Sequence, residues 1–224
     1  MTHTLTLQAI KPVTHDTYHL TFDKPEGFEF TPGQATEMRL DRDGWRDEGR
    51  PFTFASLPDE PTLDFVIKTY PDHAGVTEQI PSLEPGDTVT IKDVWGAIQY
   101  KGDGVFIAGG AGVTPFIAIL RDKLARDGAL DGNTLIYSNT AERDIILRET
   151  FEGMPGLTCH WTVTDQENSP LAHGQIDRPM LEQYVDPDAT ISYICGPDPM
   201  IDAVRDTLRD MGVAEDRIVT EDGH

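Results

Sequence analysis

Cysteine is scarce in this chain of 224 residues, which contains only Cys159 and Cys195. Two cysteines give no disulfide framework, and they cannot hold an iron–sulfur cluster, which needs about four thiolates. The 7 histidines form no metal-ligand pattern, so we expect no metal site. The sequence therefore predicts neither a disulfide scaffold nor a metal centre.

Basic residues are also scarce, because 18 Lys and Arg stand against 39 Asp and Glu, for a formal net charge of −21. This excess of acid argues against nucleic acid and anionic membranes as partners. Two explanations of the acidity stay open. One is a surface adapted to high salt, where the screening length falls to about 3 Å at 1 M. The other is an ordinary acidic cytosolic protein, which we favour.

Long uncharged segments are missing as well. The uncharged run at residues 105–120 is too short, and too rich in glycine at its middle, to span a membrane. No basic and apolar leader stands at the N-terminus, so we expect a cytoplasmic location.

Short strand-like segments and turn signals alternate over residues 1–101. Clusters rich in Pro, Gly and Asp separate the segments, and apolar residues alternate with polar ones in several of them. This pattern predicts a first domain that is a six-stranded antiparallel β-barrel, with one short helix at residues 76–80. The predicted strands are Leu5–Leu7, Tyr18–Phe22, Ala35–Leu40, Phe52–Ala55, Leu63–Lys68 and Val89–Lys92.

The rhythm changes to strand, helix, strand over residues 102–224. Alternating elements predict a second domain, a parallel-sheet α/β domain with helices on both faces. The predicted strands are Val105–Ala108, Thr134–Tyr137, Leu157–Val163, Ile191–Ile194 and Ile218–Val219. The predicted helices are Pro115–Arg126, a helix near Ile145–Phe151, Arg178–Tyr184 and Met200–Met211.

A glycine-rich turn follows the first strand of this second domain. Gly109, Gly110 and Gly112 allow a sharp turn close to a ligand. Thr114 suits the N-cap of the next helix, Pro115 its first position and Gly128 its C-cap. A helix that starts here suits a pyrophosphate. Pro115 occupies the place of the third glycine of G-x-G-x-x-G, so a tight turn without a ligand is an equally good interpretation of this motif alone.

Three motifs in order resemble the ferredoxin–NADP reductase superfamily. They are Arg50-Pro-Phe-Thr-Phe-Ala-Ser56, Gly109-Gly-Ala-Gly-Val-Thr-Pro115 and Cys195-Gly-Pro-Asp-Pro-Met200. The resemblance covers nearly the whole chain and implies a flavin-binding barrel followed by an NAD(P)-binding α/β domain. It implies a monomeric flavoprotein that takes hydride from NADPH or NADH and passes electrons to a separate carrier such as ferredoxin or flavodoxin. The alternatives are a flavin reductase, an oxygenase reductase component, or an electron-transfer subunit of a larger complex.

The resemblance also implies which residues of the barrel bind the flavin, FAD rather than FMN. Arg50 would pair with a flavin phosphate, or else it is a surface arginine facing Asp47 and Glu48. Phe52 stands where the family usually has Tyr, and Thr53 would offer its hydroxyl near flavin N5. The implied flavin-binding residues are Arg50, Pro51, Phe52, Thr53, Ser56, Val66, Ile67, Lys68, Gly75, Val76 and Thr77.

In the second domain the resemblance places Cys195 near the nicotinamide, as a pocket residue and not a covalent nucleophile. Arg143 could meet a 2′-phosphate, which favours NADPH slightly, or it is a solvated residue at a helix start. The implied nicotinamide-nucleotide residues are Gly110, Gly112, Val113, Thr114, Pro115, Ser138, Arg143, Cys195, Gly196, Pro197 and Met200.

The C-terminus completes the predicted catalytic set of Thr53, Cys195 and Glu221. In the family the end of the chain often returns to the flavin with an aromatic residue, and some members carry a glutamate shortly before it. Glu221 matches that glutamate, whereas the last residue here is His224. A frayed polar tail is the alternative interpretation.

Overall fold

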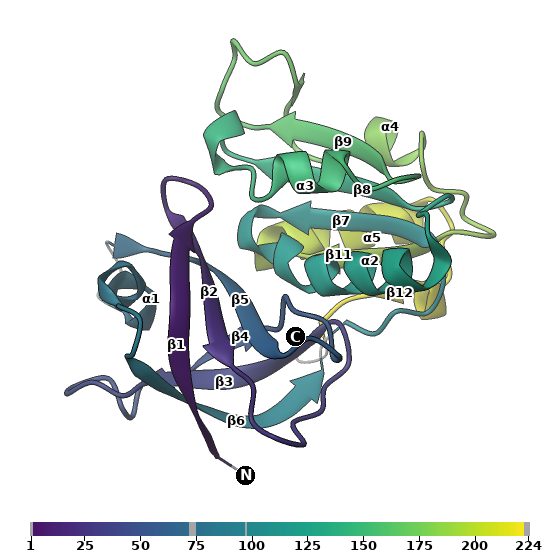
Figure 1. Ribbon diagram of the computed structural model, residues 1–224. Helices are drawn as coiled ribbons and strands as arrows, with labels where there is room; N and C mark the ends of the chain where they lie inside the picture. Colours follow the sequence, from purple (N-terminus) through teal and green to yellow (C-terminus); the bar gives the residue numbers. More distant parts are fainter. Residues whose placement is uncertain (1, 72–74, 97, 222–224) are drawn as a thin grey trace. The chain divides into compact units, whose positions relative to one another are not determined.

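The computed structural model describes residues 2–71, 75–96 and 98–221, and it divides the chain into two units, Met1–Ala97 and Ile98–His224. The first unit is an antiparallel β structure and the second an α/β structure (Figure 1). The predicted fold class is therefore confirmed for each unit.

Six antiparallel strands form one curled sheet in the first unit, in the order β4-β3-β6-β1-β2-β5. Just beyond β4, Phe54 forms a bridge with Phe65 in β5, so the two edge strands of the sheet meet. This contact curls the sheet into a barrel-like shape around one core. The strands are β1 (His3–Pro12), β2 (Thr17–Asp23), β3 (Gln34–Leu40), β4 (Arg50–Thr53), β5 (Thr62–Lys68) and β6 (Thr88–Gly96).

Aromatic side chains fill the core of this first unit. Phe54 is fully buried and stacks on Phe30 with ring centroids 4.4 Å apart, and Phe65 packs against it at 5.2 Å. Offset and tilted ring pairs of this kind add to the free energy of burial. The predicted short helix is present as α1 (Val76–Gln79), which continues into a 3₁₀ turn, η2 (Ile80–Ser82). It covers the core with Val76 and Ile80.

Six parallel strands form the sheet of the second unit, in the order β10-β9-β8-β7-β11-β12. The strands are β7 (Gly104–Gly109), β8 (Thr134–Asn139), β9 (Thr158–Val163), β10 (Ala172–His173), β11 (Ile191–Cys195) and β12 (Ile218–Val219). The sequence did not predict β10, because this strand has only two residues and is defined by its pairing with β9.

Helices cover both faces of this second sheet (Figure 1). The helices are α2 (Thr114–Asp127), α3 (Arg148–Glu152), α4 (Arg178–Leu181) and α5 (Asp198–Asp210), with 3₁₀ turns η3 (Gly110–Val113), η4 (Glu142–Asp144) and η5 (Glu215–Arg217). On one face, Phe116 of α2 packs edge-on against Phe106 of β7, with centroids 5.2 Å apart. On the other face, the apolar stripe of α5 packs with α4 against β7, β8 and β11. No helix in the described ranges is long and apolar enough to cross a membrane.

Helix ends show where the predictions hold and where they are wrong. Gly128 ends α2 in the left-handed conformation with φ +79°, as predicted. Thr114 is not the N-cap, because η3 precedes α2 and Val113 takes the N-cap position. The Thr114 hydroxyl instead donates to the carbonyl oxygen of Ala111, 3.0 Å away. The helix predicted near residues 145–151 begins only at Arg148, because Leu147 adopts a left-handed φ of +54°.

The other two helices of the second unit also differ from their predicted spans. Helix α4 is shorter than the predicted Arg178–Tyr184 and passes after Leu181 into hydrogen-bonded turns. Helix α5 starts two residues before the predicted Met200, because Pro197 provides its N-cap position.

A charged network connects the start of β7 to α2. The carboxylate of Asp103 accepts hydrogen bonds from Lys123 at 2.8 Å, from the Tyr100 hydroxyl at 2.7 Å and from Asn133 at 3.0 Å. The bond from Lys123 is the largest cause that lowers the pKa of Asp103 to about 2. A depressed pKa means that the charged carboxylate stabilises the folded state above about pH 4, and that this contribution is lost as the pH falls toward 2.

We therefore expect Asp103→Asn to lower the melting temperature at pH 7 by about 2–4 °C, the shift that about 1 kcal/mol produces in a chain of this size. The difference from the wild type should shrink between pH 4 and pH 2, the window set by the pKa of about 2. Thermal melts at several pH values measure it. Asp131→Asn, at an exposed neighbouring carboxylate, is the control. A pH-independent difference would contradict this explanation.

Candidate functional site

The glycine turn after β7 packs directly against the Cys195-Gly-Pro-Asp-Pro-Met200 segment. A Cβ atom added to Gly109 would lie 2.5 Å from Sδ of Met200. One added to Gly112 would overlap the carbonyl oxygen of Cys195 and lie 2.5 Å from the amide nitrogen of Gly196. The two motifs therefore form one surface, and neither Gly109 nor Gly112 leaves space for a methyl group.

The topology of the sheet explains why these two motifs meet. Strands β7 and β11 are parallel neighbours, and Ala108 pairs with Cys195 at their carboxyl ends. Helices α2 and α5 begin just after these ends. Ligands of open α/β sheets bind in this position, outside the carboxyl ends of the strands.

Gly110 differs from the other two glycines of this turn, because the position that its side chain would occupy is free of other atoms. It has a positive φ of +51°, and no heavy atom lies within 4 Å of the position that a Cβ would take. The hydroxyl of Tyr137, a fully buried residue of β8, donates to the carbonyl oxygen of Gly110 at 2.7 Å. Tyr137 therefore holds the turn from the side of the sheet. The opposite side of Gly110 stays free for a ligand. No sequence motif pointed to Tyr137. A tyrosine in a buried strand is the signal, because its hydroxyl needs a partner.

Cys195 and Glu221 are brought together by the last two strands of the sheet. Ser192 pairs with Ile218 and Tyr193 with Val219, and the same register, continued by two residues, places Glu221 opposite Cys195. The thiol donates to Oε1 of Glu221 across 3.2 Å. Burial first, and the neighbouring carboxylate second, raise the pKa of Cys195 well above its ordinary value. Cys195 is therefore a protonated thiol and not a thiolate nucleophile. His224 lies outside the described residues.

The carboxyl end of β8 contributes Ser138, which is half-buried, and is followed by the exposed Arg143. The Arg143 side chain is 76% exposed, and its Nε lies 3.9 Å from a carboxylate oxygen of Asp144. The neighbouring Glu142 is held by Gln166 at 3.1 Å and by Ser169 at 2.8 Å. The guanidinium of Arg143 thus remains accessible to a ligand, whereas the carboxylate of Glu142 is engaged within the protein.

In the first unit, Arg50 opens β4 and its side chain is 47% exposed. It donates to the carbonyl oxygen of Gly49 at 2.8 Å and lies 3.5 Å from the carboxylate of Glu48. The surface pairing with Glu48 that the sequence left open is therefore present, but the contact is long and solvent-exposed. Such a contact contributes little, so a phosphate could replace it.

The remaining residues of the Arg50–Ser56 motif divide between the surface and the core. Thr53 pairs with Ala35 on β3 and is half-buried. Phe52 is also half-buried and packs against the core, so its ring does not lie free on the surface. The hydroxyl of Ser56 is fully buried and accepts from the amide of Asp64 at 3.1 Å. Ser56 therefore holds β5, which is a structural task.

The other predicted flavin residues lie at the end of β5 and at the start of α1. Val66 and Ile67 are buried, and the ammonium of Lys68 lies 3.2 Å from a carboxylate oxygen of Asp16. Gly75 immediately precedes α1, and Val76 points into the core. Lys68 is therefore the one charged side chain among these predicted residues, and it is paired with Asp16.

Comparison with known proteins identifies both units. Residues 4–100 match the oxidoreductase FAD-binding domain, and residues 106–206 match the oxidoreductase NAD-binding domain. The chain therefore carries an FAD-binding domain followed by an NAD-binding domain, the two-domain arrangement of ferredoxin reductase-like flavoproteins that its motifs predict. The two domain descriptions also agree with the predicted FAD and nicotinamide cofactors.

Two curated relatives illustrate the similarity. The chain is 30% identical to NADH-cytochrome b5 reductase 2 of Mycosarcoma maydis, over 89% of this chain and 63% of the relative. It is 31% identical to the ferredoxin reductase component of 3-ketosteroid-9-alpha-monooxygenase from Mycolicibacterium smegmatis, over 98% of this chain and 65% of the relative. The chain thus spans less than two thirds of the length of these relatives.

Solved structures agree with the fold. The cytochrome b5 reductase domain of Ulva prolifera nitrate reductase is 25% identical, with a TM-score of 0.82 over 96% of this chain and 95% of that one. A ferredoxin NADP+ reductase from Neisseria gonorrhoeae, solved with FAD and NADP, is 20% identical with a TM-score of 0.82, over 94% of this chain and 92% of that one, and supports the fold alone.

The residues present fit the two cofactor classes. Gly110 leaves the outer side of its turn open, and the neighbouring glycines allow a close approach of backbone and ligand. Arg50 and Arg143 are two exposed guanidinium groups with only long contacts to carboxylates, which suits phosphate binding. Each unit thus offers a cation on the predicted binding surface.

Proposed function

We propose that this chain is an NAD(P)H-dependent flavoprotein reductase that passes electrons to a separate carrier. The observation that carries the proposal is the joined surface of the second unit. There the glycine turn, the Cys195–Met200 segment and Glu221 lie together at the carboxyl ends of β7 and β11. Bound FAD would supply the conversion of a hydride into single electrons.

Each residue of this proposal has a physical task. The backbone N–H groups at the start of α2 favour the pyrophosphate of the nicotinamide nucleotide. The buried Cys195 thiol, hydrogen-bonded to Glu221, shapes the wall of the nicotinamide pocket. In the first unit Arg50 would pair with a flavin phosphate, and the half-buried Thr53 would offer its hydroxyl to the flavin.

The flavin assignment predicts the behaviour of Arg50→Ala. Removing one charge-assisted phosphate contact costs about 1.5–3 kcal/mol, so flavin affinity should fall about ten- to hundredfold. The exposed position of Arg50 means that the melting temperature of the flavin-free protein should stay unchanged. Flavin titration followed by fluorescence measures the affinity. Arg46→Ala is the control, because Arg46 pairs with Asp41 and Asp43. Equal flavin affinity in both variants would contradict the assignment.

The choice between NADPH and NADH rests on Arg143. Its exposed guanidinium supports NADPH, whereas the relative from Mycosarcoma maydis is named for NADH. Arg143→Ala should weaken NADPH about tenfold and leave NADH unchanged, because only NADPH carries the 2′-phosphate. Dissociation constants for both nucleotides decide it. An equal effect on both would refute the role of Arg143.

The acceptor is a separate protein, and we propose a one-electron carrier of the ferredoxin or flavodoxin kind. The relatives include reductase components of oxygenases, among them one from Mycolicibacterium smegmatis and one of propane 2-monooxygenase from Rhodococcus jostii, so a role as an oxygenase reductase is the second candidate. We further propose that the chain acts as a cytoplasmic monomer.

One spectrum and two titrations test the proposed function. The purified protein should be yellow, or become yellow with FAD, and anaerobic NADH or NADPH should bleach the flavin absorbance. Steady-state reduction of a dye by the isolated chain separates a reductase from a subunit that works only within a complex. A colourless protein that neither FAD nor FMN reconstitutes would overturn the proposal.

A further inference from the structure

The first unit contains a cavity of about 500 Å³ that none of the assignments above uses. Its lining combines two aromatic rings with two carboxylates and a few neutral groups. The lining residues are Phe28, Glu29, Phe30, Thr31, Gln34, Pro58 and Asp59. A cavity that combines aromatic side chains with a few polar groups is typical of a binding site.

This cavity adjoins the strand that the flavin motif occupies. Gln34 is the first residue of β3, and its carbonyl oxygen accepts a hydrogen bond from the amide of Phe54 at 3.1 Å. Phe54 directly follows Thr53, and Pro58 stands two residues after Ser56. A molecule in the cavity would therefore lie next to the Arg50–Ser56 motif.

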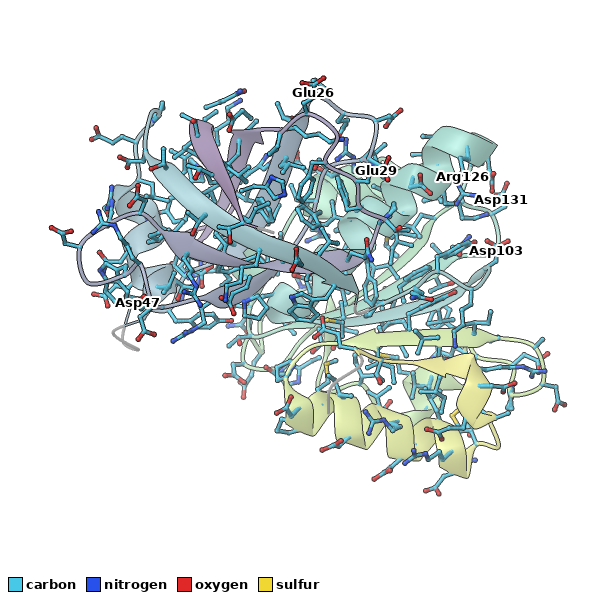
Figure 2. The ribbon with its side chains drawn as sticks, turned by 90° about the horizontal axis from the view of Figure 1, so that it is seen from below. Glu26, Glu29, Asp47, Asp103, Arg126 and Asp131 are labelled. Carbon is cyan, nitrogen blue, oxygen red and sulfur yellow. The ribbon has the colours of Figure 1, made fainter. Side chains whose placement is uncertain are left out.

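The lining of the cavity is acidic. Glu29 and Asp59 are both exposed, and neither carboxylate has an ion-pair or hydrogen-bond partner within residues 2–71, 75–96 and 98–221. The segments 23–31 and 57–60 carry five carboxylates and a single lysine. Figure 2 labels two of the carboxylates, Glu26 and Glu29. The potential at this surface is therefore negative.

The single lysine indicates which ligand chemistry the cavity accepts. Nζ of Lys24 donates to the carbonyl oxygen of Pro58 and lies 5.6 Å from the centre of the Phe30 ring. A cation over an aromatic face is a favourable contact. The chain thus already places one of its own ammonium groups near Phe30, a ring that lines the cavity.

Three arginines elsewhere in this unit are paired with carboxylates. Arg39 pairs with Glu37 at 2.7 Å, Arg42 with Asp87 at 2.7 Å, and Arg46 with Asp41 at 2.6 Å. Each arginine is neutralised by a carboxylate, so these three residues offer no free basic patch for an acidic carrier.

We infer that this cavity is the docking point for a basic side chain of the electron-acceptor protein. The occupant is a lysine or arginine, whose apolar stem packs against Phe28 and Phe30 while its charged head reaches Glu29 and Asp59. The inference rests on the proposed function, because the acceptor has to bind near the flavin. Whatever redox group the carrier holds, the face that it presents to this chain is basic.

The test measures binding separately from catalysis. The probe is horse-heart cytochrome c, a basic haem protein, with its succinylated acidic form as the second probe. The test variant is the double substitution Glu29→Lys/Asp59→Lys in the flavin-loaded protein. The control variant is Asp131→Lys/Asp210→Lys, which reverses two exposed charges in the second unit. The dissociation constants are measured by calorimetry at low ionic strength.

We expect Glu29→Lys/Asp59→Lys to weaken binding of native cytochrome c at least tenfold, whereas the control variant changes it less than threefold. The succinylated probe should bind the wild type at least tenfold more weakly than native cytochrome c. Equal weakening by the two variants would mean general attraction by a chain of charge −21, and it would overturn the docking point. Loss of flavin absorbance in the test variant would overturn it too, because the cavity would then belong to the flavin site.

Anaerobic reduction of the flavin by NADH in the same variants separates the two proposals. If the variants and the wild type all accept hydride, the proposed function stands. The dissociation constants for cytochrome c then decide whether the cavity is the docking point. If no protein in the series accepts hydride, the proposed function fails, whatever the binding data show.

Discussion

Gly112→Ala is expected to abolish measurable binding of the nicotinamide nucleotide and to lower the free energy of unfolding by about 3 kcal/mol. The added Cβ would overlap the backbone of Cys195 and Gly196, which cannot rotate away as a side chain can. The turn would have to separate from the Cys195 segment, and the joined surface would be lost. Urea denaturation and a fluorescence titration with NADH measure the two effects.

Gly110→Ala is the matched control for this experiment. Gly110 lies two residues away and has a positive φ of +51°, but its Cβ position is open. The variant should lose only about 1 kcal/mol, the cost of a left-handed conformation for alanine. If Gly112→Ala proved no less stable than Gly110→Ala, the packing of the turn against Cys195 would not matter for the fold.

Glu221→Ala is expected to slow flavin reduction by NADH or NADPH at least tenfold, which corresponds to about 1.4 kcal/mol in the barrier. The carboxylate holds the Cys195 thiol at 3.2 Å, and without it the wall of the nicotinamide pocket loses its fixed orientation. Misplacement of reacting groups by small distances is costly in rate. Stopped-flow absorbance at saturating nucleotide measures the reduction step itself.

Two further measurements identify the cause of such an effect. Glu215→Ala removes an exposed glutamate from the same C-terminal segment, where it pairs with Arg209, and should leave the rate unchanged. Alkylation of Cys195 should become faster in Glu221→Ala, because the carboxylate is one cause of the raised pKa. If Glu221→Ala reduces its flavin at the wild-type rate, Glu221 has no catalytic part.

Sequence patterns predicted those helix ends that depend on the residue at the end itself. The stop of α2 at Gly128 could be predicted because a positive φ is a property of glycine itself. The N-cap at Thr114 could not, because the turn before it packs against Cys195, a contact distant in the sequence. Leu147 escaped prediction for a similar reason, since nothing in its residue type favours a left-handed φ.

The candidate site was predicted in the same uneven way. Motif spacing indicated that the glycine turn and Cys195 belong together, and their contact in the second unit agrees with this. The register of β11 and β12, which places Glu221 opposite Cys195, could not be derived from a two-residue strand pattern. Tyr137 and the acidic cavity were missed, because neither forms a motif along the chain.

The pairing of the first strand has a consequence for synthesis on the ribosome. Strand β1 pairs on one side with β2, which follows at once, and on the other side with β6, where His3 meets Ile91 near the end of the unit. At about 5–20 residues per second, several seconds separate the two partners. During that time β1 leaves one edge unpaired, and an unpaired edge can recruit foreign strands. The polar and charged residues on the strand, His3, Thr4, Thr6 and Lys11 among them, thus limit aggregation of the nascent chain.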